Sequence, residues 1–216
     1  MIKLIRSIKL SLFFKSIIYN FLINNNAEKK IIFNPESLWR GNKINGVRIL
    51  EGFLSYQNET LNLVKNIWKK NHGSISWNNH LHGFMWIKDI RAVGTNNARI
   101  FVRRNLLAWI NEINYSDEQI WKENVLAKRI FYLLTNLSFF FETADENFQK
   151  KFSEHLNKQC MILHKLIKKK KKVDIFSLKS MILSTFCFNN LSGHYSFSIR
   201  LLLKTLKEDI SDDGLH

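Results

Sequence analysis

The chain has 216 residues, of which 45% are apolar and 24% are charged. A chain of this length can bury roughly 70% of the surface that its unfolded state exposes, so we expect one self-supporting domain with a short flanking segment. Seventeen Phe and six Trp exclude a disordered chain, and the two cysteines, Cys160 and Cys187, exclude a disulfide scaffold. One proline and eight glycines are too few for the turns of an all-β fold, which favours an all-α protein.

The formal net charge of +15 favours a polyanionic partner, which could be nucleic acid, an anionic membrane or an acidic polysaccharide. A competing explanation is that AT-rich codons have enriched the chain in lysine. The sequence contains neither a GxGxxG nor a GxxxxGKS/T loop, and no nucleic-acid-binding motif. We therefore expect no nucleotide cofactor and no specific nucleic-acid partner.

Residues 1–23 are basic and apolar, and a short polar linker follows them to about residue 30. Lys15 interrupts the apolar stretch and no small-residue cleavage site follows it, so we predict neither a signal peptide nor a membrane span. Two interpretations of residues 1–23 remain: a helix that docks on the domain, or a helix that lies on an anionic membrane surface. The compartment stays open, with the cytoplasm or the membrane periphery favoured over secretion.

Residues 31–216 are expected to form the helical domain. Short helices are predicted over 46–54 and 59–69, and the pattern becomes strongly helical after Gly73. Apolar spacing, N-cap residues and two capping-box patterns define the later helices. We expect these over 96–113, 116–141, from the capping box at Thr143–Glu146 to the lysines at 168–172, 174–188, and from Ser192 or Gly193 to about Lys207. Such a series is typical of antiparallel helical hairpins packed side by side.

The segment WNNHLHGFMW holds the densest group of side chains suited to recognition. Aromatic faces beside imidazole and amide groups are typical of a sugar-binding wall, because sugars offer both apolar ring faces and hydroxyls. We therefore single out Trp77, His80, His82 and Trp86 as candidate substrate-binding residues. The alternative interpretation places the two tryptophans in the core and leaves the histidines satisfied at its rim.

Other candidate sites are weaker. His80 and His82 diverge on a helix, and Cys160 with His164 supplies only two ligands, so we predict no metal site. No nucleophile constellation or justified pair of catalytic carboxylates is present. Five arginines among the aromatic-rich helices could grip carboxylates, sulfates or phosphates, or could form a solvated face: Arg91, Arg99, Arg103, Arg104 and Arg129.

The stretch from Trp77 to Ala92, W-x-x-x-LHGF-x-W-I-x-x-I-R-A, resembles the helical domain of heparinase II/III family proteins of the alphaproteobacterial type. Upstream, Gly41-Asn42 and GVRILEG (46–52) resemble the lead-in segment of that family. Downstream, three segments follow its order, and the resemblance covers about residues 34–216. These segments are Trp109-Ile110, VLAKRI (125–130) and the helix over 146–163.

The resemblance implies an incomplete (α/α) toroid of helical hairpins, which the family follows with a C-terminal β-sandwich. Family members cleave acidic polysaccharides by β-elimination: a base removes the proton beside the uronic carboxylate, polar groups neutralise that carboxylate, and an acid protonates the departing oxygen. By this analogy, Trp77, His80, His82 and Trp86 line the groove for an acidic polysaccharide.

The chain departs from the family pattern in two places. Lyases of the family carry an Asn-His pair where this chain has Val173 to Phe176, so no catalytic residue is assigned. Residues 213–216 resemble the family's Asp-Gly-x-His element, but the β-sandwich does not follow. We expect a domain that binds the polysaccharide but is inactive alone, the β-sandwich being separately encoded or missing. The alternative is a non-catalytic basic module that docks on a partner domain or an anionic membrane through residues 1–23 and the lysine run.

Overall fold

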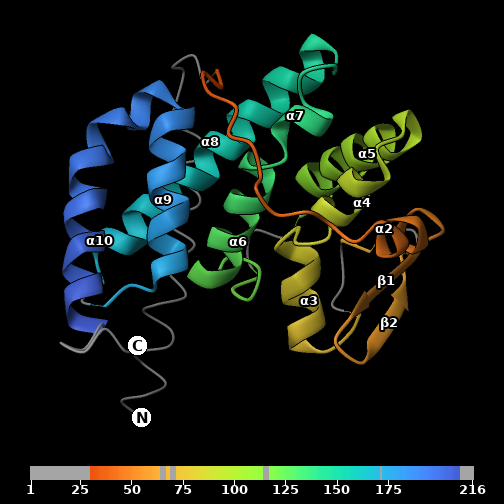
Figure 1. The fold of residues 1–216 in the computed structure, drawn as a ribbon, viewed down its shortest axis with the longest axis horizontal. Helices are drawn as coiled ribbons and strands as arrows, with labels where there is room; N and C mark the ends of the chain where they lie inside the picture. Colours follow the sequence, from red (N-terminus) through yellow and green to blue (C-terminus); the bar gives the residue numbers. More distant parts are fainter. Residues whose placement is uncertain (1–29, 64–66, 69–71, 114–116, 171, 210–216) are drawn as a thin grey trace.

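A computed structural model describes residues 30–63, 67–68, 72–113, 117–170 and 172–209 (Figure 1). The helix expected over 1–23 and its linker lie outside the described residues. The described part is mostly helical, as the composition predicts, and it also contains one small hairpin. Its elements are α2 (Lys43–Leu50), β1 (Phe53–Tyr56), β2 (Glu59–Asn62), α3 (Ile75–His82), α4 (Ile87–Val93), α5 (Asn96–Glu112), α6 (Glu123–Leu134), α7 (Leu137–Phe140), α8 (Glu146–Lys168), α9 (Ile175–Cys187), the 3-10 helix η1 (Asn189–His194) and α10 (Tyr195–Asp209).

The hairpin corrects the helix predicted over 59–69. β1 and β2 are antiparallel, and the hydroxyls of Ser55 and Thr60 lie 2.8 Å apart across the pair. Within β2, half-buried Glu59 and Leu61 alternate with exposed residues, which is the period of a strand rather than of a helix. The helix predicted over 46–54 exists but is shifted toward the N-terminus, because the Asn42 side chain caps it at the backbone N–H groups of residues 44 and 45.

Helix α2 lies directly on α4 because glycines occupy the contact. A Cβ at Gly46 would collide with the carbonyl oxygen of Asp89, and one at Gly41 would collide with that of Lys88. The backbone N–H of Asn42 donates to the Asp89 carboxylate at 2.8 Å, which ties the start of α2 to the middle of α4. The close approach therefore depends on two residues that lack side chains.

The single helix predicted over 116–141 is divided into α6 and α7. Its predicted cap, Ser116, lies outside the described residues, and α6 begins only at Glu123. The Asp117 side chain instead accepts from the backbone N–H of Gln119 in a turn. At the break, the Asn136 amide donates to the Tyr132 carbonyl at 2.7 Å, a side-chain bond of the kind that competes with the helical pattern.

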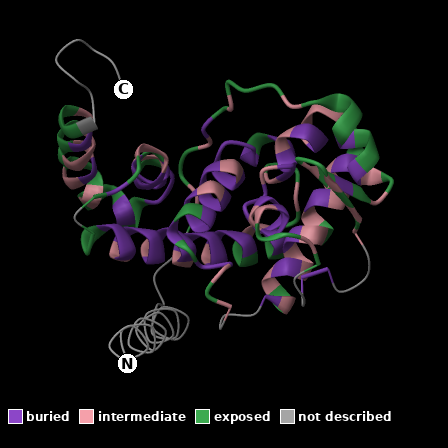
Figure 2. Ribbon diagram, turned by 90° about the horizontal axis from the view of Figure 1, so that it is seen from below, coloured by how far each residue is buried: buried purple, intermediate pink, exposed green. Residues whose placement is uncertain are grey.

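Helix α8 crosses the molecule and supplies much of its core. Asp145, and not the predicted Thr143, caps it, and its carboxylate accepts from the Phe148 backbone N–H at 2.9 Å. Figure 2 shows buried residues along this long helix, whereas α10 at the left edge carries more exposed ones. The stripe predicted from residue spacing is buried throughout: it consists of Phe148, Phe152, Leu156, Cys160, Leu163 and Ile167.

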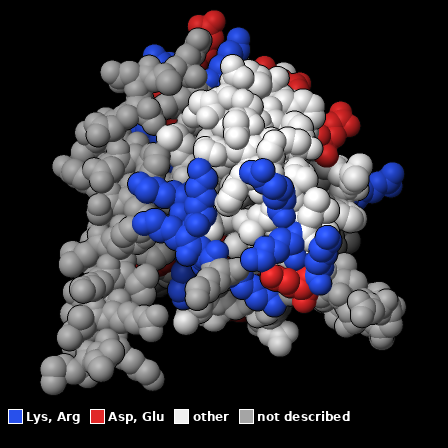
Figure 3. Space-filling view, turned by 90° about the vertical axis from the view of Figure 1, so that its left-hand side faces the viewer, with Lys and Arg blue, Asp and Glu red and all other residues white. Residues whose placement is uncertain are grey.

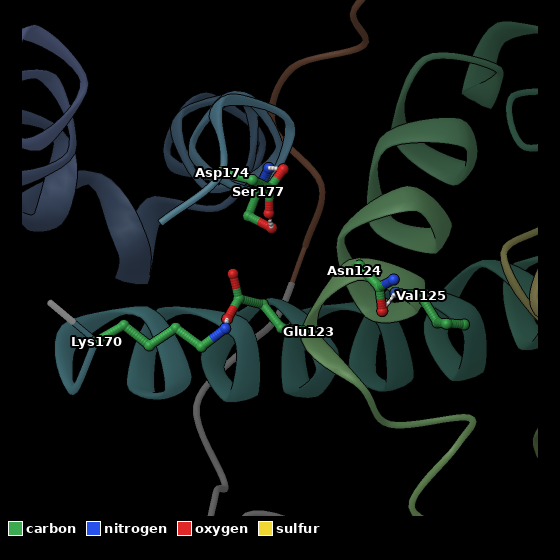
Figure 4. A network of polar contacts seen from close by, with 6 residues as sticks. All are labelled: Glu123, Asn124, Val125, Lys170, Asp174 and Ser177. Carbon is green, nitrogen blue, oxygen red and sulfur yellow. Dashed lines mark hydrogen bonds and ion pairs between the residues drawn. The ribbon is translucent and has the colours of Figure 1, made fainter. Parts of the chain in front are cut away.

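The ends of three helices meet beside the C-terminus of α8 (Figure 4). Glu123, the first residue of α6, forms an ion pair with Lys170, just beyond α8. Asp174 caps α9 by accepting from the Ser177 backbone N–H at 3.0 Å, as the sequence predicts. Further along α9, the Ser180 hydroxyl donates to the Ala127 carbonyl of α6 at 3.0 Å. These contacts fix α6, α8 and α9 relative to one another.

Candidate functional site

The two tryptophans predicted to line a groove lie inside the core. Trp77 has no exposed surface and Trp86 has 1%. Both indole N–H groups are satisfied by backbone carbonyls at 3.1 Å, that of Trp77 by Leu54 and that of Trp86 by Leu81. Neither ring offers a face to solvent in this conformation, so their burial supports the core interpretation.

His82 is also buried, and its surroundings keep it uncharged. Its Nδ1 accepts a hydrogen bond of 3.1 Å from the indole N–H of Trp109, and its carbonyl accepts one of 3.0 Å from the Arg129 guanidinium. Burial, assisted by the nearby Arg129 charge, lowers the pKa of His82 to about 3. The imidazole is therefore a neutral acceptor within the core at physiological pH.

Arg129, which the sequence offered as an anion ligand, is fully buried and organises the centre of the domain. Its guanidinium donates to the Gln159 side chain and, at 3.1 Å, to the Ile120 carbonyl. Its Cζ lies 4.7 Å from the ring centroid of Trp109 and 5.0 Å from that of Trp121. Buried cations need such partners. These contacts join α5, α6 and α8, and they direct the charge inward.

Three of the other arginines bind backbone carbonyls. Arg99 and Arg103 on α5 donate to the carbonyls of Phe139 and Phe140 at 3.1 and 2.7 Å, at the C-terminal end of α7. Carbonyls at a helix end lack helical partners, and basic side chains commonly satisfy them. Arg91 donates to the Trp39 carbonyl at 2.6 Å. These three arginines therefore stabilise the fold by satisfying backbone carbonyls.

His80 lies at the edge of the core and, at 8%, is the most exposed of the four predicted residues. Its ring stacks on that of Tyr56, with centroids 4.2 Å apart and planes 16° from parallel. Its Nδ1 has no hydrogen-bond partner among the described residues. Burial lowers its pKa to about 4, assisted by the charges of Lys88 and Lys128, so the imidazole is neutral at pH 7.

Further side chains complete this group, which we call the His80 cluster. Lys88 on α4 and Lys128 on α6 are half-buried and lie close enough to influence the His80 imidazole. Burial raises the pKa of Tyr132, with smaller effects from Asp89 and Tyr56, and burial also raises the pKa of Asp89. The cluster comprises Tyr56, His80, Lys88, Asp89, Lys128 and Tyr132.

The His80 cluster combines an aromatic stack, an uncharged imidazole and two ammonium groups from β1, α3, α4 and α6. Such a set can pack against a sugar ring while the lysines pair with a carboxylate or sulfate. Sequence reasoning found His80 but missed the lysines and tyrosines. Lys128 and Tyr132 are four residues apart and so share a face of α6, a signal the sequence does contain. The proximity of Tyr56 depends on the hairpin.

Figure 3 shows a second group of basic side chains on the end of the molecule that carries α10, beside a wide area of uncharged residues. The last turn of α8 approaches α10, where the Lys168 ammonium lies 5.8 Å from the Phe197 ring centroid. Two of its lysines are paired with acids, Lys170 with Glu123 and Lys204 with Glu208. We call this region the lysine face, and its exposed members are Lys168, Lys169, Lys170, Lys172, Arg200, Lys204 and Lys207.

Among the described residues, no group of three or more His, Cys, Asp or Glu side chains is placed to hold a metal ion. In the same part of the chain, no helix is both long and apolar enough to cross a membrane. Comparison of the chain with protein-family models, with curated proteins and with solved structures finds no match.

Proposed function

We propose that this chain is the N-terminal helical domain of a heparinase II/III-like polysaccharide lyase, and that it binds an acidic polysaccharide without cleaving it alone. The observation that carries the proposal is the stacking of neutral His80 on Tyr56 beside Lys88 and Lys128. An aromatic surface flanked by cations suits a chain of uronic or sulfated sugars.

The helical architecture is compatible with this proposal. In the proposed arrangement, the successive helices belong to an incomplete (α/α) toroid, and a separately encoded or missing β-sandwich supplies the catalytic groups. The segments that carry the family resemblance come together in the fold, since Trp109 bonds to His82 and Arg129 bonds to both His82 and Gln159. In this arrangement the buried Trp77 and Trp86 pack beneath the surface that binds the polysaccharide, and His80 contacts the polysaccharide.

The proposal is tested by titrating the full chain with heparin, which carries both carboxylates and sulfates, and with neutral dextran. Replacing Lys88 and Lys128 together by Gln removes the two cations of the His80 cluster. Because a charge-assisted hydrogen bond contributes about 1.5–3 kcal/mol, we expect the Kd for heparin to rise about tenfold or more. Dextran, which lacks anionic groups, is expected not to bind.

The matched control replaces Lys204 and Lys207, on the lysine face, by Gln. This variant loses the same formal charge, so a general electrostatic attraction would weaken equally in both variants. Equal losses would overturn the assignment of the His80 cluster. Release of an unsaturated uronic product, seen as near-ultraviolet absorbance, would contradict the part of the proposal that makes the chain inactive alone.

The lysine face supports a second candidate function, docking on an anionic membrane or partner surface. Lysines near anionic lipid contribute on the order of 1 kcal/mol each. Sedimentation with phosphatidylglycerol vesicles tests this function, since the Lys204 and Lys207 substitutions should then weaken vesicle binding and leave heparin binding unchanged. Vesicle binding that is insensitive to these substitutions would reject the lysine face as the docking surface.

A further inference from the structure

An apolar groove separates the extended segment 35–39 from α9 and α10. It encloses about 520 Å³, and its walls come from four elements: Pro35 to Trp39, α6, α9 and α10. Leu183 and Phe186 of α9 and Leu202 and Leu206 of α10 line it. The space suits the side chains of one apolar helix stripe. Large exposed apolar surfaces on soluble proteins commonly mark interaction sites.

Exposed apolar residues along the rim indicate that the described part of the chain leaves this groove open. Leu38 is 88% exposed and Trp39 is 58% exposed. Trp39 is nevertheless held in place. Its carbonyl accepts a 2.6 Å hydrogen bond from Arg91, and the Lys179 ammonium lies 5.8 Å from its ring centroid and 4.4 Å from that of Phe131. A fixed aromatic side chain at the edge of an apolar groove binds with little loss of conformational freedom.

The chain itself contains a segment with a complementary pattern. Leu4, Ile5, Ile8 and Leu12 have the spacing of one helix face, whereas Lys3, Arg6 and Lys9 fall on the opposite face. Residues 1–23 contain no acidic residue. A helix over residues 3–12 would bury this stripe in a groove and leave Lys3, Arg6 and Lys9 in solvent. Lys15 lies seven residues after Ile8 and so shares the apolar face, which ends the apolar stripe after Leu12.

The described chain begins beside the groove. Ile31 pairs with Phe188 at the end of α9, and the Ile32 backbone N–H donates to the Cys187 carbonyl at 3.0 Å. The linker over residues 24–29 can span up to about 20 Å when extended, which is roughly the length of α9. A segment that precedes this linker is therefore tethered within reach of the groove, at a high effective concentration.

We propose that residues 1–23 dock as a helix in this groove, with Leu4, Ile5, Ile8 and Leu12 against α9, α10 and Trp39. This inference is independent of polysaccharide binding at the His80 cluster. It assigns the basic apolar N-terminal segment to the protein's own surface and leaves Lys3, Arg6 and Lys9 exposed.

Trp39 provides a direct test because the other five tryptophans are at most 4% exposed. Acrylamide, a neutral quencher, should therefore report mainly on Trp39, and W39F should remove the quenchable component. If residues 1–23 cover the groove, Trp39 is protected in the full chain. Replacing Ile8 and Leu12 together by Gln should abolish that protection without changing the net charge, and the quenching constant should rise.

The matched control replaces Lys3 and Lys9 by Gln, which leaves the apolar stripe intact and should leave Trp39 protected. If acrylamide quenches Trp39 in the unmodified chain as strongly as in the Ile8 and Leu12 variant, the proposal is overturned. The proposal is also overturned if residues 1–23 bind only to added phosphatidylglycerol vesicles and leave Trp39 open to acrylamide. Protection that disappears on dilution would also overturn it, because a second copy would then cover the groove. Unchanged protection in the Ile8 and Leu12 variant would have the same consequence.

Discussion

The indole N–H of Trp109 donates to Nδ1 of His82 at 3.1 Å, and His155 packs edge-on against the same indole with ring centroids 5.4 Å apart. Trp109 therefore joins two histidines from α3 and α8 within one buried group. Burial, followed by the influence of Arg129, lowers the pKa of each histidine to about 3. The packing at the centre of the domain therefore requires neutral imidazoles.

Acid should destabilise the protein in a defined pH window. His82, His155 and His164 have folded-state pKa values of about 3, whereas an unperturbed histidine has a pKa of about 6.5, so the unfolded state takes up protons first. Their contribution is complete above pH 6.5 and declines as the pH falls toward 3, at up to about 1.4 kcal/mol per pH unit for each group. Melting temperatures measured between pH 7.5 and 4 should fall steadily, and a flat profile would contradict neutral burial.

A histidine substitution can assign part of this pH dependence. The ring Nε2 of His164 lies 2.7 Å from the Ser184 hydroxyl. H164Q keeps a polar group for this contact and removes the titration, so its melting temperature should depend less steeply on pH. His72 is exposed, and H72Q serves as the control whose profile should follow that of the unmodified protein. A steeper profile for H164Q would oppose the assignment.

Replacing Arg129 should be among the most damaging changes. R129M leaves the carbonyls of His82 and Ile120 without their buried donor, which should cost about 3 kcal/mol in the free energy of unfolding. R129K should also destabilise, because an ammonium lacks the planar guanidinium that lies against two indoles. Urea unfolding provides the measurement. Arg200 is exposed on α10, and R200M should stay within about 0.5 kcal/mol of the unmodified protein.

The contact of α2 with α4 can be tested with a single methyl group. G46A places a Cβ against the Asp89 carbonyl and should destabilise by about 1–3 kcal/mol, as overpacked sites do. G193A is the matched change, because no atom lies within 4 Å of a Cβ built there. The two variants should therefore separate in urea unfolding. Equal stabilities would show that α2 can move away from α4 without loss.

The two cysteines should resist thiol reagents in the folded state. Burial raises the pKa of Cys187 to about 12 and raises that of Cys160 as well, so little thiolate is present at neutral pH. Reaction with an aromatic disulfide reagent should be slow in buffer. In urea it should be rapid, and both cysteines should react. Rapid reaction of either thiol under native conditions would contradict this burial.

Sequence patterns predicted those elements whose determinants are local. The predicted Asp174 cap begins α9, and the apolar stripe of α8 faces the core as its spacing indicates. The start of α8 was predicted to within two residues, although Asp145 caps it and Thr143 does not. The break at Asn136 and the hairpin were missed. The hairpin depends on cross-strand pairing, and the break on side-chain bonds that compete with the helix. Neither effect appears in apolar periodicity.

The candidate site was predictable only in part, for a related reason. Composition drew attention to the segment from Trp77 to Trp86, but composition does not distinguish an aromatic wall from a core. Tyr56 of β1 stacks on His80, and Lys88 and Lys128 lie close enough to influence its imidazole because α4 packs on α6. Residues that meet through the packing of separate elements cannot be paired from one sequence alone.

The extended segment before α2 also determines how the protein would respond to mechanical load. Its attachments lie in series along the chain: Ile32 bonds to Cys187, Asn34 to Glu142, and the Trp39 carbonyl to Arg91. A pull on the N-terminal end would break them one at a time, and the α5–α8 core would bear load only afterwards. The segment would therefore peel away at low force, whereas shearing the interlocked helices would require many contacts to fail together.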